Sequence, residues 1–176
     1  LHLESSPETG TKITVEVPAG VNKLVLRWKQ VDSFASERLG VLSFNELVWL
    51  PANCDADNVR VQPSVRLPLN WSGVSALNRQ PATGLVNLPE VSVAQLIDSP
   101  LLMGQHLLQV PLTSPSTGQF PHAITIAAET QQAMELPEKF KEHHVNLVEE
   151  VHQLFKSHHY AHYDWLLSMT EVPRAF

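Results

Sequence analysis

The first two thirds of the chain alternate apolar and polar positions with the two-residue period of β-strands. In residues 11–17 and 22–30 an apolar side chain recurs at every second position, which places these side chains on one face of each strand. Residues 18–20 (PAG) supply a turn between them. The pattern predicts a hairpin.

Three further stretches extend this β pattern. Residues 41–50 are densely apolar, which predicts a strand covered on both faces and ended by Pro51. Residues 59–71 show the clearest alternation, but Pro63 and Pro68 cannot donate to a ladder, so this strand is expected at an edge or broken by a bulge. A short strand over 74–77 continues the meander.

Residues 80–89 are predicted to be a loop, and 91–97 a helical turn that leads into Asp98-Ser99-Pro100. Strands resume over 106–110 and 123–127. Short strands separated by many of the 13 prolines indicate a β-sandwich, because long helices tolerate proline poorly.

The pattern changes to a helical period after Thr130. Within residues 136–155 apolar positions recur at three and four residues, which predicts a helix with one buried stripe, and Pro137 suits its first turn. Residues 160–169 then predict an aromatic strand. The fold class expected is mainly β: an antiparallel sandwich domain over 1–130, followed by a helix and a strand that begin a second α/β domain over 131–176.

Composition excludes several classes of function. Apolar residues make up 43% and charged residues 17%, and no stretch approaches the roughly 20 apolar residues of a membrane helix. Twelve scattered basic residues against 18 acidic ones give no nucleic-acid footprint. The chain starts at Leu1 without a signal peptide, so we expect its true N-terminus to be absent.

Nine histidines, six of them between His143 and His162, raise a metal hypothesis. His158 and His162 are four residues apart and would share one face of a helix or of a strand. Zinc needs three or four ligands, however, and no His-x-x-x-His pair here holds the glutamate of an HExxH helix. We therefore predict no metal ligands in this chain, and solvent-exposed histidines near a domain junction.

Other catalytic groups are also expected to be structural. Ser99 lacks the flanking glycines of a nucleophile elbow, so Asp98 and Ser99 are predicted to hydrogen-bond nearby backbone in a turn. The adjacent Glu149 and Glu150 point apart on a helix and form a solvated face. The single Cys54 excludes an internal disulfide and is expected to be an inert small hydrophobe.

Three tryptophans of the β region, Trp28, Trp49 and Trp71, leave a second class of function open. Exposed aromatic rings stack on sugars in β-sandwich binding modules. Each of these rings lies in phase with apolar neighbours or within an apolar run, so core packing is the more economical interpretation. The alternative function is a stand-alone sandwich that binds carbohydrate or protein.

Two segments carry a resemblance to a known family: VAQLIDSPLLMGQH (93–106) and HHYAHYDWLLSMT (158–170). They resemble the glycyl aminopeptidases, large bacterial zinc metallopeptidases with a thermolysin-like catalytic domain and a PDZ module behind it. In that family Asp-Ser-Pro-x-x-x-Gly closes an N-terminal β domain, and a helix and a Tyr-rich strand open the catalytic domain. The matching positions are Leu96, Asp98, Ser99, Pro100 and Gly104, the helix from Glu138, and His162, Tyr163, Asp164, Leu166 and Leu167.

The resemblance implies scaffold roles for these positions and assigns no catalytic residue and no metal ligand; substrate-binding residues stay unknown. The family's cleft segment, Gly-Gly-x-Glu-His, and its HExxH helix would follow Phe176, so zinc belongs to the parent enzyme and this portion is expected to be inactive by itself. Its expected partners are the rest of the catalytic domain and, in the parent, a peptide substrate. Many relatives are exported to the periplasm or cell envelope, but the residues of this chain leave its own compartment undetermined.

One structural feature separates the two functions. A peptidase fragment should leave apolar surface exposed on its C-terminal helix and strand, whereas a complete binding module should pack both onto the sandwich.

Overall fold

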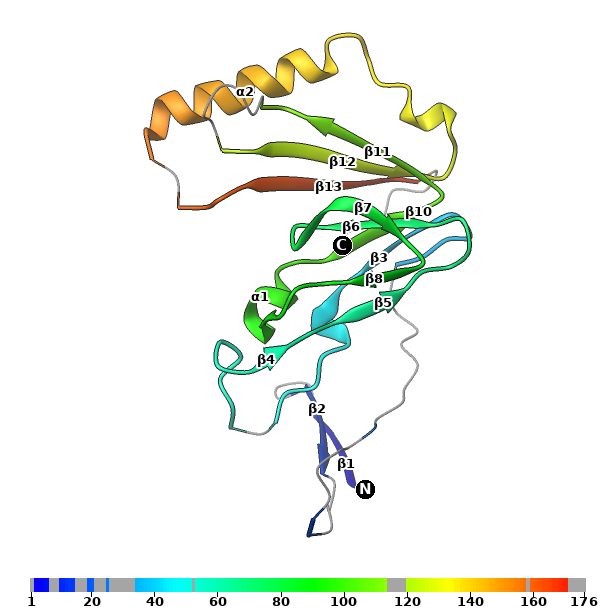
Figure 1. The fold of residues 1–176 in the computed structure, drawn as a ribbon, viewed down its shortest axis with the longest axis vertical. Helices are drawn as coiled ribbons and strands as arrows, with labels where there is room; N and C mark the ends of the chain where they lie inside the picture. The colour runs from blue at the N-terminus through cyan, green and yellow to red at the C-terminus, as the bar shows by residue number, and fades with distance from the viewer. Residues whose placement is uncertain are drawn as a thin grey trace.

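The computed structural model describes residues 2–6, 10–14, 19–20, 25, 34–51, 53–113, 120–157 and 159–170. Two units lie one above the other (Figure 1). We call residues 34–105 the sandwich unit and residues 106–170 the helix-covered sheet. A separate antiparallel pair, β1 (His2–Ser6) with β2 (Gly10–Thr14), precedes them.

The sandwich unit is built from short antiparallel strands. One sheet has the order β3-β10-β6-β7, and the pairs β4-β9 and β5-β8 complete the unit among the described residues. Its elements are β3 (Leu39–Leu42), the 3₁₀ helix η1 (Phe44–Glu46), β4 (Arg60–Val61), β5 (Ser64–Arg66), β6 (Ser72–Ser75), β7 (Asn78–Thr83), β8 (Leu85–Asn87), β9 (Val91–Ser92), α1 (Val93–Ile97) and β10 (Leu101–Gly104).

The core of the sandwich unit lies between the four-stranded sheet and the two strand pairs. Leu101 of β10 and Val86 of β8 are buried there, together with Leu96 of α1 and Trp71. Apolar side chains at alternate positions supply this core, because successive residues of a strand face opposite sides. The core therefore ties α1 and the Asp-Ser-Pro segment to the sheet.

The helix-covered sheet has the order β11-β12-β13, and α2 covers one of its faces (Figure 1). β11 (His106–Pro111) and β12 (His122–Ala128) are antiparallel, whereas β13 (Tyr163–Met169) runs parallel to β12. The helix α2 (Phe140–Phe155), preceded by the 3₁₀ helix η3 (Gln132–Met134), makes the crossover that a parallel pair requires. All seven residues of β12 are buried, as in a strand covered on both faces.

Apolar contacts join the two units. Leu102 of β10, Leu39 of β3 and Val74 of β6 form one buried cluster with Ala127 of β12, and Leu166 of β13 packs against it. The face of the helix-covered sheet opposite α2 is thus packed on the sandwich unit. Because β12 is an almost continuous apolar run, both of its faces need to be covered. The sandwich unit covers the face that α2 does not.

The predicted fold class is confirmed: the chain is mainly β, with antiparallel sheets followed by a C-terminal helix and strand. The helical turn over 91–97 and the strands over 106–110 and 123–127 are also confirmed. The strand over 59–71 is interrupted near its prolines, as expected, into β4 and β5.

Other elements differ from the prediction. Only the start of the predicted strand over 41–50 is a strand, because β3 ends at Leu42. Residues 44–46 form a 3₁₀ helix instead, and this helix places Phe44 in the core. The predicted loop over 80–89 is wrong, because it holds most of β7 and all of β8, whose side chains are largely exposed and so lack a strong apolar pattern. The predicted hairpin over 11–30 lies mostly outside the described residues.

The helix also differs at its start. α2 begins at Phe140, after a turn at Glu138 and Lys139, so Pro137 precedes the helix instead of entering its first turn. It ends at Phe155, and Lys156 follows with a left-handed φ of 49°. No helix of the described residues is long and apolar enough to cross a membrane.

The division at residue 130 stays a prediction. β11 and β12 lie before it and share a sheet with β13, which lies after it.

Candidate functional site

The Asp-Ser-Pro segment fixes α1 to the sandwich unit. Ser92 caps the helix, since its hydroxyl accepts a hydrogen bond from the backbone N–H of Gln95 at 3.1 Å. The buried hydroxyl of Ser99 donates to the Gln95 carbonyl at 2.8 Å. The buried Ser75 of β6 then donates to the Ser99 carbonyl at 3.1 Å.

These contacts confirm that Ser99 has a turn role. Its hydroxyl is buried and satisfied by backbone, so it is not presented to a substrate as a nucleophile is. Asp98 is exposed and occupies the C-cap of α1. Gly104 ends the motif where a Cβ atom would lie 3.0 Å from the Arg38 carbonyl oxygen, so the close pairing of β10 with β3 requires glycine.

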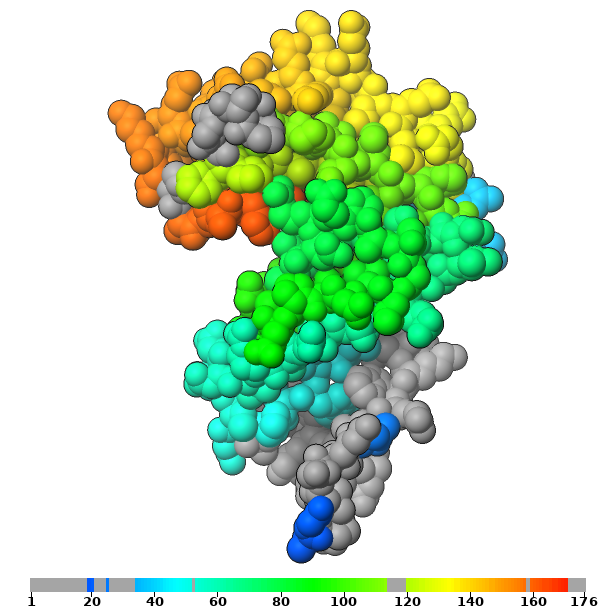
Figure 2. Space-filling view, in the orientation of Figure 1, coloured from blue at the N-terminus to red at the C-terminus, as the bar shows by residue number. Residues whose placement is uncertain are grey.

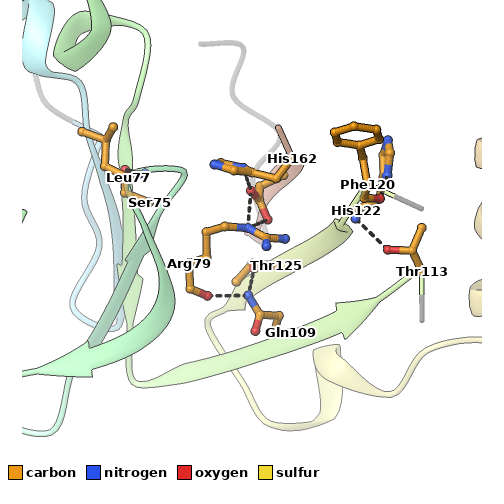
Figure 3. A network of polar contacts seen from close by, with 10 residues as sticks. Ser75, Leu77, Arg79, Gln109, Thr113, Phe120, His122, Thr125 and His162 are labelled. Carbon is orange, nitrogen blue, oxygen red and sulfur yellow. Dashed lines mark hydrogen bonds and ion pairs between the residues drawn. The ribbon is translucent and has the colours of Figure 1, made fainter. Parts of the chain in front are cut away.

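An ion-pair cluster connects the two units (Figure 3). The Nε of Arg79, on β7, lies 2.9 and 3.1 Å from the two carboxylate oxygens of Asp164, on β13. The Nδ1 of His162 lies 2.7 Å from the same carboxylate. The Asp164 side chain is only 4% exposed, so it is a buried charge held by partners on two sides.

A glutamine extends the same connection. The side-chain amide of Gln109, on β11, donates to the backbone carbonyl of Arg79 at 2.8 Å and reaches the Thr125 hydroxyl of β12 at 3.4 Å (Figure 3). We call Arg79, Gln109, His162 and Asp164 the junction clamp. It fixes the edge strand β7 of the sandwich unit to β11 and β13 of the helix-covered sheet, while Gln109 also links β11 to β12.

A second cluster surrounds His122 of β12, between the sheet and α2. Its Nδ1 lies 2.7 Å from the Phe120 carbonyl, which can only accept, so Nδ1 carries the proton. The Nε2 then accepts from the Tyr160 hydroxyl at 3.1 Å. The ring of His152, on α2, meets the His122 ring edge-on with centroids 5.0 Å apart.

Burial lowers the pKa of His122. The hydrogen bond to the Phe120 carbonyl and the charge of Asp164 act in the opposite sense, while His152 and Arg79 lower the pKa further. Because desolvation disfavours the charged form most, the neutral imidazole is favoured at this position.

A pocket of about 280 Å³ opens beside this cluster. Its walls are aromatic and aliphatic side chains, namely His122, Leu147, Val148, Val151, Tyr160, Tyr163 and Trp165. The pocket lies where α2 passes over the start of β13.

Two adjoining hollows lie at the other end of the helix-covered sheet. One, of about 350 Å³, is lined by Ser36, Glu37, Arg38, Glu129 and Thr130, and the other, of about 120 Å³, by Glu129, Thr130, Ala133, Met169 and Thr170. Arg38 crosses the junction here, since its Nη1 donates to the Glu129 carbonyl at 3.1 Å. The larger hollow therefore lies between the sandwich unit and the carboxyl end of β12, whereas the smaller one lies within the helix-covered sheet, at the carboxyl ends of β12 and β13.

Of the two histidines predicted as a pair, His158 lies outside the described residues. His162 belongs to the junction clamp and is half-buried, so it is not the solvent-exposed histidine that was predicted. Within the described residues no three His, Cys, Asp or Glu side chains are placed to hold a metal ion. Glu149 and Glu150 are exposed on α2, as predicted.

Cys54, which was expected to be an inert small hydrophobe, is a free cysteine exposed at the surface. Trp71 is buried in the core of the sandwich unit, so the core interpretation is confirmed for this ring. Trp49 is half-buried, and Trp28 lies outside the described residues.

The family model of the Peptidase M61 N-terminal domain matches residues 4–105, more than half of the chain. The chain belongs to this family. No curated protein matches it. The M61 N-terminal domain ends at the residue before β11, so it includes the whole sandwich unit, and the junction clamp joins this domain to the helix-covered sheet.

The sequence carried little signal for the clamp or for the His122 cluster. Asp164 and His162 fall in a segment that the family resemblance singled out, but their partner Arg79 lies in a stretch next to a predicted loop. His122 precedes the buried apolar run of β12, and a histidine adjoining such a run is the signal that would have indicated a buried imidazole.

Proposed function

We propose that residues 1–176 are the non-catalytic N-terminal portion of a zinc-dependent aminopeptidase, in which they shape the substrate cleft. One observation carries the proposal. The helix-covered sheet is fixed to the M61 N-terminal domain on one face, while α2 on the other face exposes Leu147, Leu154 and Phe155. In a complete unit an outer helix buries its apolar side chains against the sheet. The exposed apolar side chains of α2 therefore support a further part of the catalytic domain that packs over them.

The sandwich unit and the helix-covered sheet are in contact on the face shown in Figure 2. The family match ends at Gln105 and β11 starts at His106, so we place the start of the catalytic domain at β11, earlier than residue 131. This position keeps β11, β12 and β13 in a single domain.

The hollow of about 350 Å³ between the two units, together with the smaller hollow that adjoins it, supports a role in shaping the cleft. They lie at the carboxyl ends of the parallel strands β12 and β13, which is where open α/β sheets bind ligands. In this role Glu37 and Arg38 of the M61 N-terminal domain form one wall of the cleft. A peptide would meet this wall while its scissile bond lies elsewhere in the enzyme.

Zinc, supplied by ligands outside residues 1–176, would polarise the scissile carbonyl and activate water. By resemblance we include in the proposal a thermolysin-like catalytic domain, a preference for N-terminal glycine, a PDZ module and export from a bacterial cytoplasm. Residues 1–176 themselves contribute scaffold, junction and cleft wall.

The coding sequence downstream of Phe176 tests the proposal. We expect a Gly-Gly-x-Glu-His segment, then an HExxH motif and a further glutamate. A stop codon, or a continuation that has no zinc motif, would remove the peptidase and favour a binding module.

A further inference from the structure

The C-terminal half of α2 is held on the sheet at very few positions. Val148 is the buried residue of the helix, and from Glu149 to Phe155 every residue except His152 is exposed. Leu154 and Phe155 are 75% and 66% exposed. Contact between His152 and the buried His122 is therefore a main attachment of the last turns of α2 to β12.

The hydrogen bonds of the neutral His122 ring assign a different role to each of its nitrogens. Its Nδ1–H donates to the Phe120 carbonyl, and its Nε2 accepts from the Tyr160 hydroxyl. When Nε2 takes up a proton it becomes a donor, and the Tyr160 hydroxyl must turn so that its oxygen accepts this hydrogen bond. Protonation therefore reverses the hydrogen bond to Tyr160 and places a charge beside the aromatic pocket and the ring of His152.

The groups that face His122 come from four elements. His152 of α2 and Arg79 of β7 oppose a positive charge, whereas Asp164 of β13 favours it. Tyr160, from the connection between α2 and β13, and Tyr163 of β13 add their phenol rings. Asp164 is already engaged by Arg79 and His162, so its charge is shared with these partners.

We propose that His122 and His152 form a pH-dependent latch, which holds the C-terminal half of α2 on the sheet while both rings are neutral and releases it when they are protonated. Two imidazolium rings with centroids 5.0 Å apart repel each other across the boundary between α2 and β12. Release would uncover the aromatic pocket and extend the exposed apolar surface of α2. The latch depends on these described contacts and not on the peptidase assignment.

Hydrogen exchange of the 176-residue chain tests the latch. Amide exchange is followed by mass spectrometry between about pH 8 and about pH 5, the interval over which histidines change charge, and is corrected for the intrinsic effect of pH. We expect a severalfold loss of protection over residues 149–155 at the acid end, with β11 and β12 unchanged. Protection of α2 that stays constant across the range overturns the proposal.

Two glutamine substitutions separate the latch from general acid destabilisation. His152→Gln removes one of the facing charges, and His143→Gln makes the matched change at an exposed position of the same helix. We expect His152→Gln to suppress most of the acid loss of protection and His143→Gln to leave it unaltered. Equal losses in both variants overturn the proposal.

An NMR titration of the His122 ring distinguishes charge repulsion from simple packing. The midpoint of this titration should change when His152 is replaced only if the two rings interact through their charges. Since His152 opposes the charge on His122, the midpoint of His122 should rise in His152→Gln. A midpoint that does not change, or falls, contradicts the repulsion on which the latch rests.

Discussion

Arg79 and Asp164 are 85 residues apart in sequence, yet the Nε of Arg79 lies 2.9 Å from a carboxylate oxygen of Asp164. The pair joins β7 of the M61 N-terminal domain to β13 of the helix-covered sheet. A buried carboxylate that loses its cationic partner is strongly destabilising, because the charge then has no compensation. The relative position of the two units therefore depends on this pair.

Arg79→Ala should destabilise the chain. Asp164 is buried but Arg79 is partly exposed, so we expect a loss of about 2 kcal/mol in the free energy of unfolding, between the values for surface and buried pairs. Urea denaturation measures the loss. The matched control is Arg60→Ala, whose pair with Glu90 is exposed and should contribute at most about 1 kcal/mol.

A double-mutant cycle with Asp164→Asn isolates the interaction. The double variant should be less destabilised than the sum of the single variants. Strict additivity, or equal losses in Arg79→Ala and Arg60→Ala, would show that the pair does not hold the junction.

Ser75→Ala should cost about 1 to 3 kcal/mol of stability, the range for leaving a buried polar group unsatisfied. The substitution removes the donor to the Ser99 carbonyl and the acceptor of the Leu77 N–H. Ser64→Ala, at an exposed position of β5, provides the control and should change stability by less than about 0.5 kcal/mol. Thermal denaturation of both variants decides whether the hydroxyl of Ser75 is structural.

Gly104→Ala should destabilise the pairing of β3 with β10. The new Cβ atom would lie 3.0 Å from the Arg38 carbonyl oxygen, in the backbone just before β3, and 3.1 Å from the Cβ of the buried Leu39. We expect a loss of about 1 to 3 kcal/mol, as for overpacked cores. A Cβ atom added at Gly73 would meet only the ends of leucine side chains. Gly73→Ala should therefore lose less stability than Gly104→Ala, and it serves as the comparison. A larger loss at Gly73 would refute the backbone explanation.

The stability of the chain should depend on His122 at mildly acid pH. Because burial lowers its pKa below the ordinary value of about 6.5, the unfolded chain binds the proton more readily than the folded chain. The free energy of unfolding should therefore fall as pH drops below neutrality, and this contribution should level off once folded His122 is also protonated. In His122→Gln the fall should be smaller. Urea denaturation at several pH values measures both slopes, and identical slopes would contradict the prediction.

Much of the fold follows from local patterns in the sequence. β12 and α2 were predictable because a dense apolar run and a three-to-four-residue period are strong signals. β7 and β8 were not, because Val86 is the one buried side chain among their residues, so they give no alternating apolar pattern. The start of α2 moved to Phe140 because residues 138–139 form a turn after Pro137.

The candidate site was less predictable than the fold. The Asp-Ser-Pro turn depends on neighbours in sequence, so its structural role could be inferred. The junction clamp and the facing rings of His122 and His152 depend on contacts between distant segments. No periodicity records such contacts, and only the fold brings these side chains together.

The central claim is that residues 1–176 are the scaffold of a zinc peptidase whose chemistry lies elsewhere. The most direct test is hydrolysis of a glycine-initiated peptide by the complete natural protein, before and after removal of zinc by a chelator, beside the 176-residue chain. We predict chelator-sensitive hydrolysis by the complete protein, restored by zinc, and none by the 176-residue chain. A complete protein that binds no zinc and cleaves no such peptide would contradict the account.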